Sequence, residues 1–297
     1  MNLLVTGAWR CTHEQLDSIA LLGHTVYFLQ NETDALPLPY EQVEGVICNG
    51  LFLHHPICRF TGLRYIQLTS AGFDRVPMDY VKAHNIPIHN ARGVYSIPMA
   101  EFAVSGVLQI YKQSRFFWEN QKQSKWEKHR GLLELYGKQV CIVGCGSVGT
   151  ECARRFGAFG CCVTGVDLLP REDAHYARME SLDCLDAVLP EADIVVLTLP
   201  LTEQSRHLID KTRLEAMKQG AVLVNIARGA VVDTAALTDW LKEKQGAAVL
   251  DVFEEEPLDA ASILWQMENV ILTPHNSFVG DGNSQRLFRT ILENLKR

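Results

Sequence analysis

Polar side chains suited to proton transfer and anion binding follow three apolar segments in the second half of the chain. Arg228 follows the run VLVNIA, three consecutive glutamates beginning at Glu254 follow GAAVLDVF, and His275 follows NVILTP. Arginine binds a carboxylate through two parallel hydrogen bonds, histidine exchanges protons near neutral pH, and a carboxylate can hold an imidazole. Together these residue types suit the reduction of a 2-keto acid to a 2-hydroxy acid, with the hydride carried by a cofactor.

Each of these residues also has a structural interpretation that the sequence alone leaves open. An isolated histidine after an apolar run is more often part of a turn or a core than of an active site. The glutamates 254–256 could form a solvated loop, and Arg228 could pair in a surface salt bridge. The catalytic interpretation is favoured because parallel strands bring their carboxyl ends to one edge of a sheet, where ligands bind.

A glycine-rich turn precedes these residues in the chain. It matches the pattern G-x-G-x-x-G with Gly144, Cys145, Gly146, Ser147, Val148 and Gly149. The turn follows the apolar run 140–143 and opens a predicted helix, which is the context that the pattern requires. The first glycine permits a tight turn, the second lets the backbone approach a pyrophosphate, and the third lets the helix pack closely on the strand. Because a helix N-terminus attracts anions, the turn predicts a dinucleotide site.

Asp167 ends the next predicted strand and bears on the choice of dinucleotide. A carboxylate at this place accepts hydrogen bonds from the 2′-hydroxyl of a ribose and repels a 2′-phosphate. The sequence therefore predicts NAD, with NADH as its reduced form, rather than NADP. Arg171 lies four residues farther on and could receive a 2′-phosphate, so NADP remains the alternative.

The elements that must position these residues alternate between strand and helix. In the first ninety residues we predict strands over 2–7, 24–29, 45–50, 64–69 and 86–90. Two helices lie among them, over 12–22 and 77–85, and Thr12 and Gln15 have the spacing of a capping box at the start of the first. Such alternation is typical of a parallel sheet covered by helices on both faces.

The same alternation starts again at residue 137. Strands are predicted over 138–144, 161–167, 192–200, 221–227, 246–253 and 269–274. Helices are predicted over 147–159, around 214–217, over 233–244 with Asp233 as its cap, and over the amphipathic tail 284–297. The chain is therefore predicted to hold a second α/β domain.

One segment departs from the alternation. Residues 99–121 are predicted to form a single long helix, which leads into a polar and aromatic arm that reaches residue 130. Exposed aromatic residues in such a segment favour a contact with a second subunit, so a homodimer through residues 99–130 is predicted. The alternative is a solvated helix that packs on its own domain.

Composition and charge argue against several classes of protein. The 297 residues are 47% hydrophobic and 21% charged, as in a globular protein of two ordinary domains. A net charge of −7 argues against nucleic acid or an anionic membrane surface as a partner. No apolar run approaches the ~18 residues of a membrane span, and the first residues lack the pattern of a secretory signal.

The nine cysteines contain no CxxC pair and no paired metal-ligand spacing. Cys141 and the pair Cys161-Cys162 fall on predicted strands. Buried, reduced thiols in a cytoplasmic protein are therefore predicted, with no disulfide framework and no metal site.

Motifs over most of the chain resemble the D-isomer-specific 2-hydroxyacid dehydrogenases. The resemblance rests on GCGSVG with Asp167, LTLPLT, NIARGAVVD, LDVFEEEPL and VILTPH, in this order and spacing, and on LTSAGFDRVPMD and NARGVYSIPMAEFAV nearer the N-terminus. It implies two doubly wound α/β domains, with a Rossmann NAD-binding domain inserted into a flavodoxin-like substrate domain. The expected bounds are 97–276 for the NAD-binding domain, and 1–96 with 277–297 for the substrate (catalytic) domain.

The resemblance also implies roles for individual residues. The family's catalytic arginine, glutamate and histidine match Arg228, Glu256 directly before Pro257, and His275. The aspartate of LDVF, here Asp251, and the carbonyl of Ala227 are expected to bind the nicotinamide carboxamide. The backbone amides of the substrate loop are expected to hold the substrate carboxylate, in the residues Ser70, Ala71 and Gly72. Further cofactor contacts are expected from the LTLPLT segment at Leu199 and Pro200.

The resemblance leaves the substrate open. Leu51 and Phe52 would favour a small or apolar group on the 2-keto acid, and His54 and His55 are expected at the surface. Residues 276–278, Asn-Ser-Phe, stand where many family members have small residues and glycines. Two other functions remain as alternatives: an NADH-responsive binding protein of the same fold, like the corepressors related to this family, and a different Rossmann enzyme.

Overall fold

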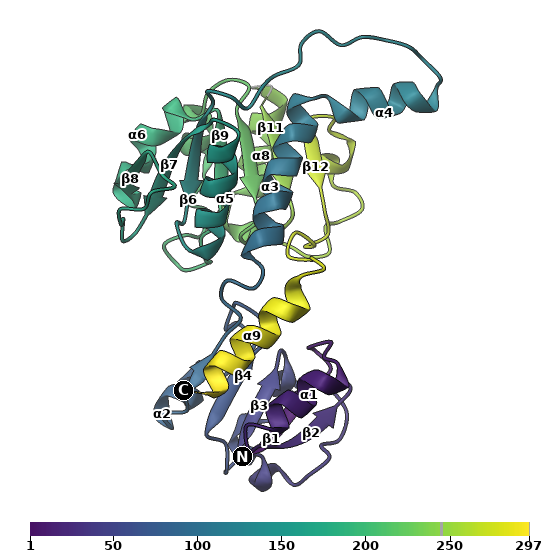
Figure 1. The fold of residues 1–297 in the computed structure, drawn as a ribbon. Coiled ribbons are helices and arrows are strands. Elements are labelled where there is room, and N and C mark those ends of the chain that lie inside the picture. The colour runs from purple at the N-terminus through teal and green to yellow at the C-terminus, as the bar shows by residue number, and fades with distance from the viewer. Residues whose placement is uncertain (244–245, 297) are drawn as a thin grey trace. The chain divides into compact units, whose positions relative to one another are not determined.

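The structure, a computed structural model, describes residues 1–243 and 246–296. The chain forms two compact units, shown in Figure 1. Unit 1 contains Met1–Tyr95 and the segment from Gly280 onward, and unit 2 contains Ser96–Val279. Unit 2 is thus inserted into the sequence of unit 1, and the divisions fall at residues 95/96 and 279/280.

Unit 1 is built on a parallel sheet with the strand order β2-β1-β3-β4-β5, which is the flavodoxin-like order. Its strands are β1 (Asn2–Thr6), β2 (Thr25–Leu29), β3 (Gly45–Cys48), β4 (Tyr65–Leu68) and β5 (Ile88–His89). Its helices are α1 (His13–Ala20), α2 (Met78–Ala83) and α9 (Asn283–Leu295), with short 3-10 turns η1 (Tyr40–Gln42), η2 (Leu51–Leu53) and η3 (Ile57–Arg59). The predicted capping box is present, because Thr12 and Gln15 exchange side-chain to backbone hydrogen bonds.

Successive residues of the unit 1 strands point to opposite faces of the sheet, and both faces are buried. On one face, Leu3 and Val5 pack with Ile19 of α1 and with Leu287 and Ile291 of α9. The other face packs against α2 and the 3-10 turns. The C-terminal helix therefore belongs to the core of unit 1, although nearly two hundred residues separate it in sequence from the sheet.

Unit 2 is built on a parallel sheet with the order β12-β11-β10-β9-β6-β7-β8. Its strands are β6 (Gln139–Val143), β7 (Cys162–Asp167), β8 (Arg178–Ser181), β9 (Ile194–Leu197), β10 (Val222–Asn225), β11 (Ala247–Leu250) and β12 (Val270–Leu272). This is the Rossmann order extended by β12, and its direction of winding changes between β6 and β9. A ligand site is expected at the carboxyl ends of the strands beside this switch.

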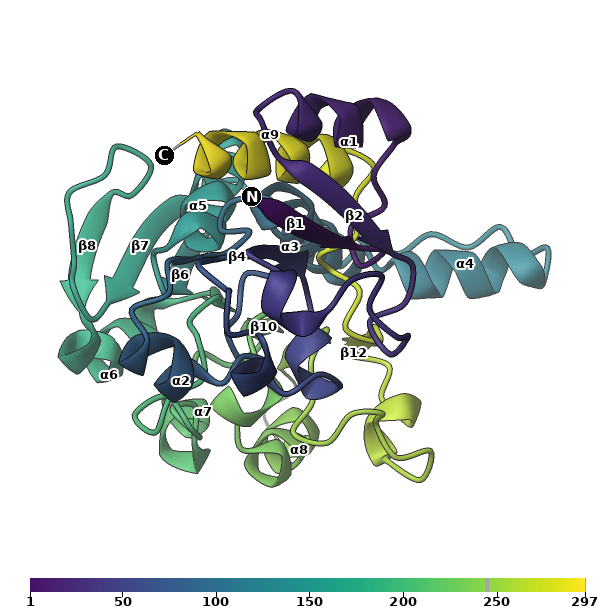
Figure 2. The same ribbon diagram turned by 90° about the horizontal axis from the view of Figure 1, so that it is seen from below.

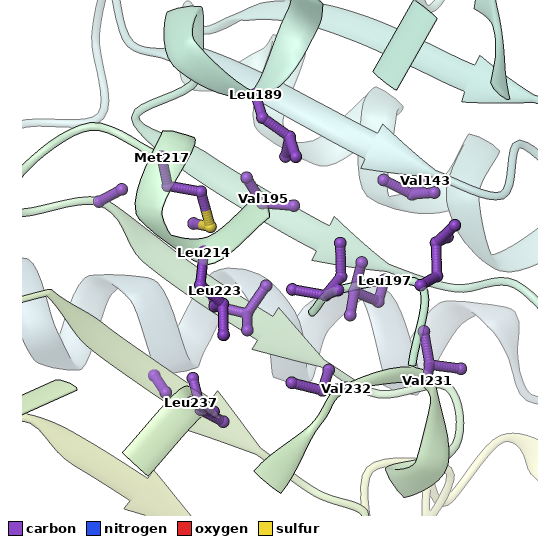
Figure 3. Packing of buried hydrophobic residues seen from close by; sticks show 14 of the residues in the cluster. Val143, Leu189, Val195, Leu197, Leu214, Met217, Leu223, Val231, Val232 and Leu237 are labelled. Atoms are coloured by element: carbon purple, nitrogen blue, oxygen red, sulfur yellow. The ribbon is translucent and has the colours of Figure 1, made fainter. Parts of the chain in front are cut away.

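Helices cover both faces of the unit 2 sheet (Figure 1). They are α3 (Ser96–Tyr111), α4 (Ser114–Lys122), α5 (Ser147–Ala158), α6 (Leu185–Val188), α7 (Lys211–Ala216) and α8 (Thr234–Glu243), with 3-10 turns η4 (Leu182–Cys184), η5 (Leu189–Glu191), η6 (Gly229–Val231) and η7 (Ile263–Gln266). One face packs on α3 and α5. The other packs on α6, α7 and α8, where Val195, Leu197 and Leu223 meet Leu214 and Leu237 (Figure 3). Each fully buried side chain of this kind contributes roughly 1.5–3 kcal/mol.

The prediction of one helix over 99–121 is wrong. Helix α3 begins at Ser96 and ends at Tyr111, and α4 begins at Ser114. Gln113 between them has a left-handed conformation, with φ of +52°. The apolar residues of α3 face the sheet, whereas α4, with its mixture of polar and aromatic residues, extends beyond the sheet (Figures 1 and 2), so the chain changes direction where its core contacts end.

The segment after β7 differs from the prediction, and one predicted helix cap is confirmed. Strand β8 and helix α6 were not predicted, because both are short and neither has a clear apolar period. Asp233 caps α8 as predicted, since its side chain accepts a hydrogen bond from Ala236 N at 2.9 Å. The predicted last residues of two helices, Lys244 and Arg297, lie outside the described residues.

All nine cysteines are free thiols. Cys141 is buried on β6 as predicted, whereas Cys162 is exposed because it is the first residue of β7. Within residues 1–243 and 246–296, no helix is both long enough and apolar enough to cross a membrane.

Candidate functional site

The polar residues singled out in the second half of the sequence lie on loops at one edge of the unit 2 sheet. Strands β6, β9, β10, β11 and β12 are parallel neighbours, so their carboxyl ends meet at the same edge. The turn 144–149 follows β6, Arg228 follows β10, Glu256 follows β11, and His275 follows β12. The sheet thus gathers one glycine turn, one cation, one carboxylate and one imidazole at this edge.

The glycine turn after β6 has the geometry that each glycine was predicted to permit. Gly144 has φ of +95°, and a Cβ there would lie 2.6 Å from the Leu199 nitrogen. A Cβ on Gly149 would lie 2.2 Å from the Gly144 carbonyl oxygen, so α5 packs against the turn as only a glycine allows. Gly146 differs, because a Cβ there would meet no described atom within 4 Å. The backbone at Gly146 is therefore open to a ligand at the start of α5.

Neighbouring strand ends hold this turn. The Asp167 carboxylate at the end of β7 accepts hydrogen bonds from Cys145 N at 2.6 Å and from Leu169 N at 3.0 Å. The Thr198 hydroxyl, directly after β9, donates to the Gly144 carbonyl oxygen. Burial raises the pKa of the Cys145 thiol to about 11, so this side chain adds no charge to the turn at neutral pH. Asp167 thus lies at the end of β7, where a ribose-binding carboxylate was predicted. It also holds the glycine turn through its hydrogen bond from Cys145 N.

Arg228 is positioned by a buried asparagine and by a close approach of two loops. The Asn225 side chain, at the end of β10, accepts from Ala227 N at 3.1 Å and donates to the Arg228 carbonyl at 3.0 Å. The Arg228 guanidinium donates from Nη1 to the Ala227 carbonyl at 2.8 Å. A Cβ on Gly229 would lie only 1.8 Å from the Phe253 carbonyl carbon, so the loop of Arg228 packs directly on the loop that leads to Glu256.

Glu256 and His275 form a hydrogen-bonded pair. His275 Nδ1 lies 2.8 Å from Glu256 Oε2, and the other carboxylate oxygen accepts a hydrogen bond from Phe253 N at 3.1 Å. The His275 side chain is 44% exposed, so a small molecule can reach its ring. With Nδ1 engaged by the carboxylate, Nε2 is the nitrogen left to exchange a proton with a ligand.

His275 has an unusual backbone, with φ of +50°. This left-handed conformation costs a non-glycine residue about 1–2 kcal/mol. Asp251 holds the turn in place: its carboxylate accepts hydrogen bonds from Thr273 Oγ1, Asn276 N and Ser277 N, and its carbonyl accepts from His275 N. Asp251 was predicted to contact a nicotinamide, and the structure places its 0% exposed side chain beneath the His275 turn.

A second histidine–glutamate pair lies nearby and was missed in the sequence. His207 Nε2 lies 2.5 Å from Glu254 Oε1, and the other oxygen of Glu254 accepts from Thr234 N at 3.0 Å. Burial raises the pKa of the Glu254 carboxyl, but the hydrogen bonds from Thr234 and His207 outweigh this effect and hold that pKa below its usual value. The pair joins the loop of His207 to the start of α8. Glu254 therefore binds a different histidine from Glu256, which is paired with His275.

In unit 1 the predicted substrate loop follows β4. The Ser70 hydroxyl donates to the Gly72 carbonyl at 3.0 Å, and the Asn90 side chain donates to the Ala71 carbonyl at 2.6 Å, which fixes the loop to the residue after β5. The predictions for the segment 49–55, which also belongs to unit 1, were only partly correct. Leu51 is 0% exposed and packs in the unit 1 core, so it offers no surface to a substrate, and His55 is buried rather than at the surface.

Comparison with known proteins shows which family and which proteins this chain is similar to. Residues 104–277 match the family described as D-isomer specific 2-hydroxyacid dehydrogenase, NAD binding domain. A (S)-sulfolactate dehydrogenase of Chromohalobacter salexigens is 33% identical over 245 residues, which cover 81% of this chain and 79% of that protein. A glyoxylate reductase of Korarchaeum cryptofilum is 34% identical over 239 residues, covering 78% of this chain and 72% of that protein.

Solved structures are similar over the whole chain. A D-isomer specific 2-hydroxyacid dehydrogenase family protein of Aeromonas salmonicida has a TM-score of 0.85 and 30% identity, covering 99% of this chain and 94% of its own. A family member of Xanthobacter autotrophicus, in a complex with NADPH and MES, has a TM-score of 0.81 and 27% identity, with 100% and 94% covered. A D-lactate dehydrogenase of Aquifex aeolicus, complexed with NAD and lactic acid, has a TM-score of 0.76 and 25% identity, with 99% and 94% covered.

Proposed function

Because the chain belongs to the D-isomer specific 2-hydroxyacid dehydrogenase family and is thus an NAD-dependent oxidoreductase, we propose that it reduces a small 2-keto acid to a D-2-hydroxy acid. His275 and Glu256 are the proposed acid–base pair, and Arg228 binds the carboxylate and carbonyl of the substrate. Unit 2 binds the cofactor, and the loop Ser70–Gly72 of unit 1 contributes backbone amides to the substrate carboxylate.

The hydrogen bond of 2.8 Å between His275 Nδ1 and Glu256 Oε2 carries the proposal. Reduction of a carbonyl places negative charge on its oxygen, which must receive a proton as the alcohol forms. A carboxylate at Nδ1 fixes the orientation of the His275 ring, so that Nε2 can deliver a proton to that oxygen. In the reverse reaction the same nitrogen accepts the proton from the hydroxy acid.

Arg228 supplies the positive charge that an anionic substrate requires. A guanidinium can donate two parallel hydrogen bonds to a carboxylate, or one each to a carboxylate and a carbonyl oxygen. Asn225 and the close packing at Gly229 hold the backbone of this residue beside the loop of Glu256. The cation and the acid–base pair therefore belong to one packed edge of unit 2.

The residues of unit 2 fit a dinucleotide. Space at Gly146 and the amino end of α5 suit a pyrophosphate, and Asp167 at the end of β7 suits a ribose diol. Ser147 and Val148 would face the phosphates, Leu199 and Pro200 would line the dinucleotide, and the Ala227 carbonyl would meet the carboxamide. The bound cofactor supplies the hydride.

Replacement of His275 by glutamine tests the acid–base role. We expect His275→Gln to lower kcat by about 10²–10⁴-fold, measured by NADH oxidation with glyoxylate, hydroxypyruvate, pyruvate, phenylpyruvate and branched 2-keto acids. His207→Gln is the matched control, because it disrupts a histidine–glutamate pair in the same unit and should retain turnover. Turnover of His275→Gln equal to that of the unaltered protein would contradict the proposal.

The cofactor preference is tested by comparing NADH with NADPH. We propose that NADH is preferred, since the Asp167 carboxylate would repel a 2′-phosphate. The KM for NADH should be the lower of the two, and Asp167→Asn should narrow the difference. A lower KM for NADPH in the unaltered protein would assign the cofactor to NADP and point to Arg171 as the phosphate partner.

We also propose a homodimer formed through α3, α4 and the arm to residue 130. Trp118 is 57% exposed and Trp126 is 97% exposed, which is unusual for side chains of this size. Light scattering during gel filtration should give a mass near twice the 33.3 kDa of one chain. Trp126→Ser should shift the mass towards one chain; a monomer in the unaltered protein would contradict the proposal.

A further inference from the structure

We propose that Asp251 is a positioning residue for His275, whose buried carboxylate and carbonyl hold the turn 273–277 in the conformation that brings the imidazole to Glu256. This inference rests on the proposed acid–base role of His275. It concerns a task for Asp251 besides the nicotinamide contact that the family resemblance implies.

The geometry of the turn shows how one residue can hold it. Asp251 Oδ1 accepts from Thr273 Oγ1 at 2.6 Å and from Asn276 N at 2.7 Å, and Oδ2 accepts from Ser277 N at 3.0 Å. The Asp251 carbonyl accepts from His275 N at 2.8 Å. The amides of three consecutive residues, 275 to 277, therefore all donate to Asp251.

This arrangement explains how His275 keeps φ of +50° without being a glycine. Successive backbone amides that converge on an anion form a concave nest, and such a nest favours a left-handed residue within it. The anion here is part of the chain and is fully buried. Opening the turn would leave a buried carboxylate without its donors, which is strongly unfavourable, so the His275 backbone stays in place.

The consequence for the reaction is a fixed ring. The same turn that sets the His275 backbone places Nδ1 at 2.8 Å from Glu256. If the turn relaxed, a smaller fraction of molecules would have the imidazole paired with the carboxylate. If Asp251 positions His275, weakening its hydrogen bonds to the turn should lower kcat. If Asp251 instead binds the carboxamide, the same change should lower the affinity for NADH.

Substitution of Thr273 distinguishes the positioning role of Asp251 from a role in cofactor binding. Thr273→Val keeps the shape of the side chain and leaves the carboxylate in place, but removes one donor from it. We expect Thr273→Val to lower kcat roughly tenfold and Asp251→Asn to lower it more, while the NADH Kd from fluorescence titration stays unchanged in Thr273→Val. Thr238→Val in α8 is the matched control, since that hydroxyl donates only within its helix, and it should retain full turnover.

The double variant distinguishes failure of this inference from failure of the proposed function. In a protein that already carries His275→Gln, Thr273→Val should lower kcat no further, because the ring that the turn positions is gone. Full activity of Thr273→Val beside an inactive His275→Gln would overturn the positioning role alone. Full activity of His275→Gln would overturn the proposed function itself. A weaker NADH Kd with unchanged kcat in Thr273→Val would assign Asp251 to the cofactor instead.

Discussion

Two turns at the same edge of the unit 2 sheet achieve an unusual backbone by different means. The turn after β6 reaches φ of +95° at Gly144, where glycine permits that conformation without a steric cost. The turn after β12 reaches φ of +50° at His275, where the proposed acid–base role requires a side chain that glycine lacks. In the second turn, hydrogen bonds from the backbone amides to Asp251 stabilise a left-handed conformation that a non-glycine residue rarely adopts.

The difference reflects what each turn offers to its ligand. A turn that binds phosphate through backbone amides functions best without side chains, and this is the role proposed for the turn at Gly146, where a Cβ would meet nothing within 4 Å of the described chain. A turn that exchanges a proton must present a particular ring at a fixed place. Its conformation then has to be stabilised from outside the turn, and a buried carboxylate does this because each of its hydrogen bonds is charge-assisted.

Glu256→Gln tests the catalytic side of this comparison and should have the largest effect. The amide oxygen can still accept from Phe253 N, but an uncharged amide NH2 group, which only donates hydrogen bonds, replaces the oxygen that faces His275 Nδ1. We expect kcat to fall by about 10²–10⁴-fold in steady-state assays with NADH. The exposed neighbour provides the control, as Glu255→Gln should keep its turnover. If kcat persisted and only KM for the keto acid rose, the imidazole would not depend on the carboxylate.

Two alanine substitutions test the cofactor side, with an intermediate effect. Gly149→Ala places a methyl 2.2 Å from the Gly144 carbonyl oxygen and should lower Tm by roughly 5 °C. Gly146→Ala meets no described atom within 4 Å, so its Tm should be unchanged while its NADH affinity, measured by fluorescence titration, falls. The reverse pattern, a destabilised Gly146→Ala with normal NADH binding, would show that the space at Gly146 is not used by a ligand.

Much of the fold could be predicted because its signals are local. Apolar runs bounded by glycines and polar residues predicted β1, β6, β7, β10 and β11, since buried parallel strands lack polar positions. The break at Gln113 was not predicted, because no glycine or proline stands near it to mark the end of α3. Strand β8 was missed because it lies at the sheet edge, where a sequence such as RMES is tolerated.

The candidate site could be predicted only where the ends of its strands could be predicted. The rule that polar residues after parallel strands meet at one edge found Arg228, Glu256 and His275, and the glycine pattern found the turn after β6. The same rule could have found Asn225 and Thr198, which also stand at strand ends, but their contacts run to backbone atoms of neighbouring loops. The pairing of His207 with Glu254 spans 47 residues and leaves no periodic signal, so it required the structure.

That second pair sharpens the comparison, since His207 also has φ of +50° and also meets a glutamate. The two glutamates lie two residues apart, yet Glu254 joins His207 to the Thr234 amide and touches no residue of the His275 turn in the described contacts. The lowered pKa of Glu254 means that its ionised form stabilises the fold. This stabilisation is complete above the usual glutamate pKa of about 4.3 and is lost as the pH falls through the lower pKa of the folded state.

Glu254→Gln should therefore have the smallest effect and the opposite signature to Glu256→Gln. The amide can still accept from Thr234 N, but it carries no charge for His207, so Tm at pH 7 should fall by roughly 2 °C with kcat unchanged. The difference in Tm between Glu254→Gln and the unaltered protein should shrink as the pH is lowered below about 4.3, because protonation removes the same charge from the unaltered protein. Thermal unfolding from pH 3 to 8 measures this. A fall in kcat as large as that of Glu256→Gln would mean that both histidine–glutamate pairs serve the reaction, and that a left-handed histidine beside a carboxylate is not by itself a sign of which one transfers the proton.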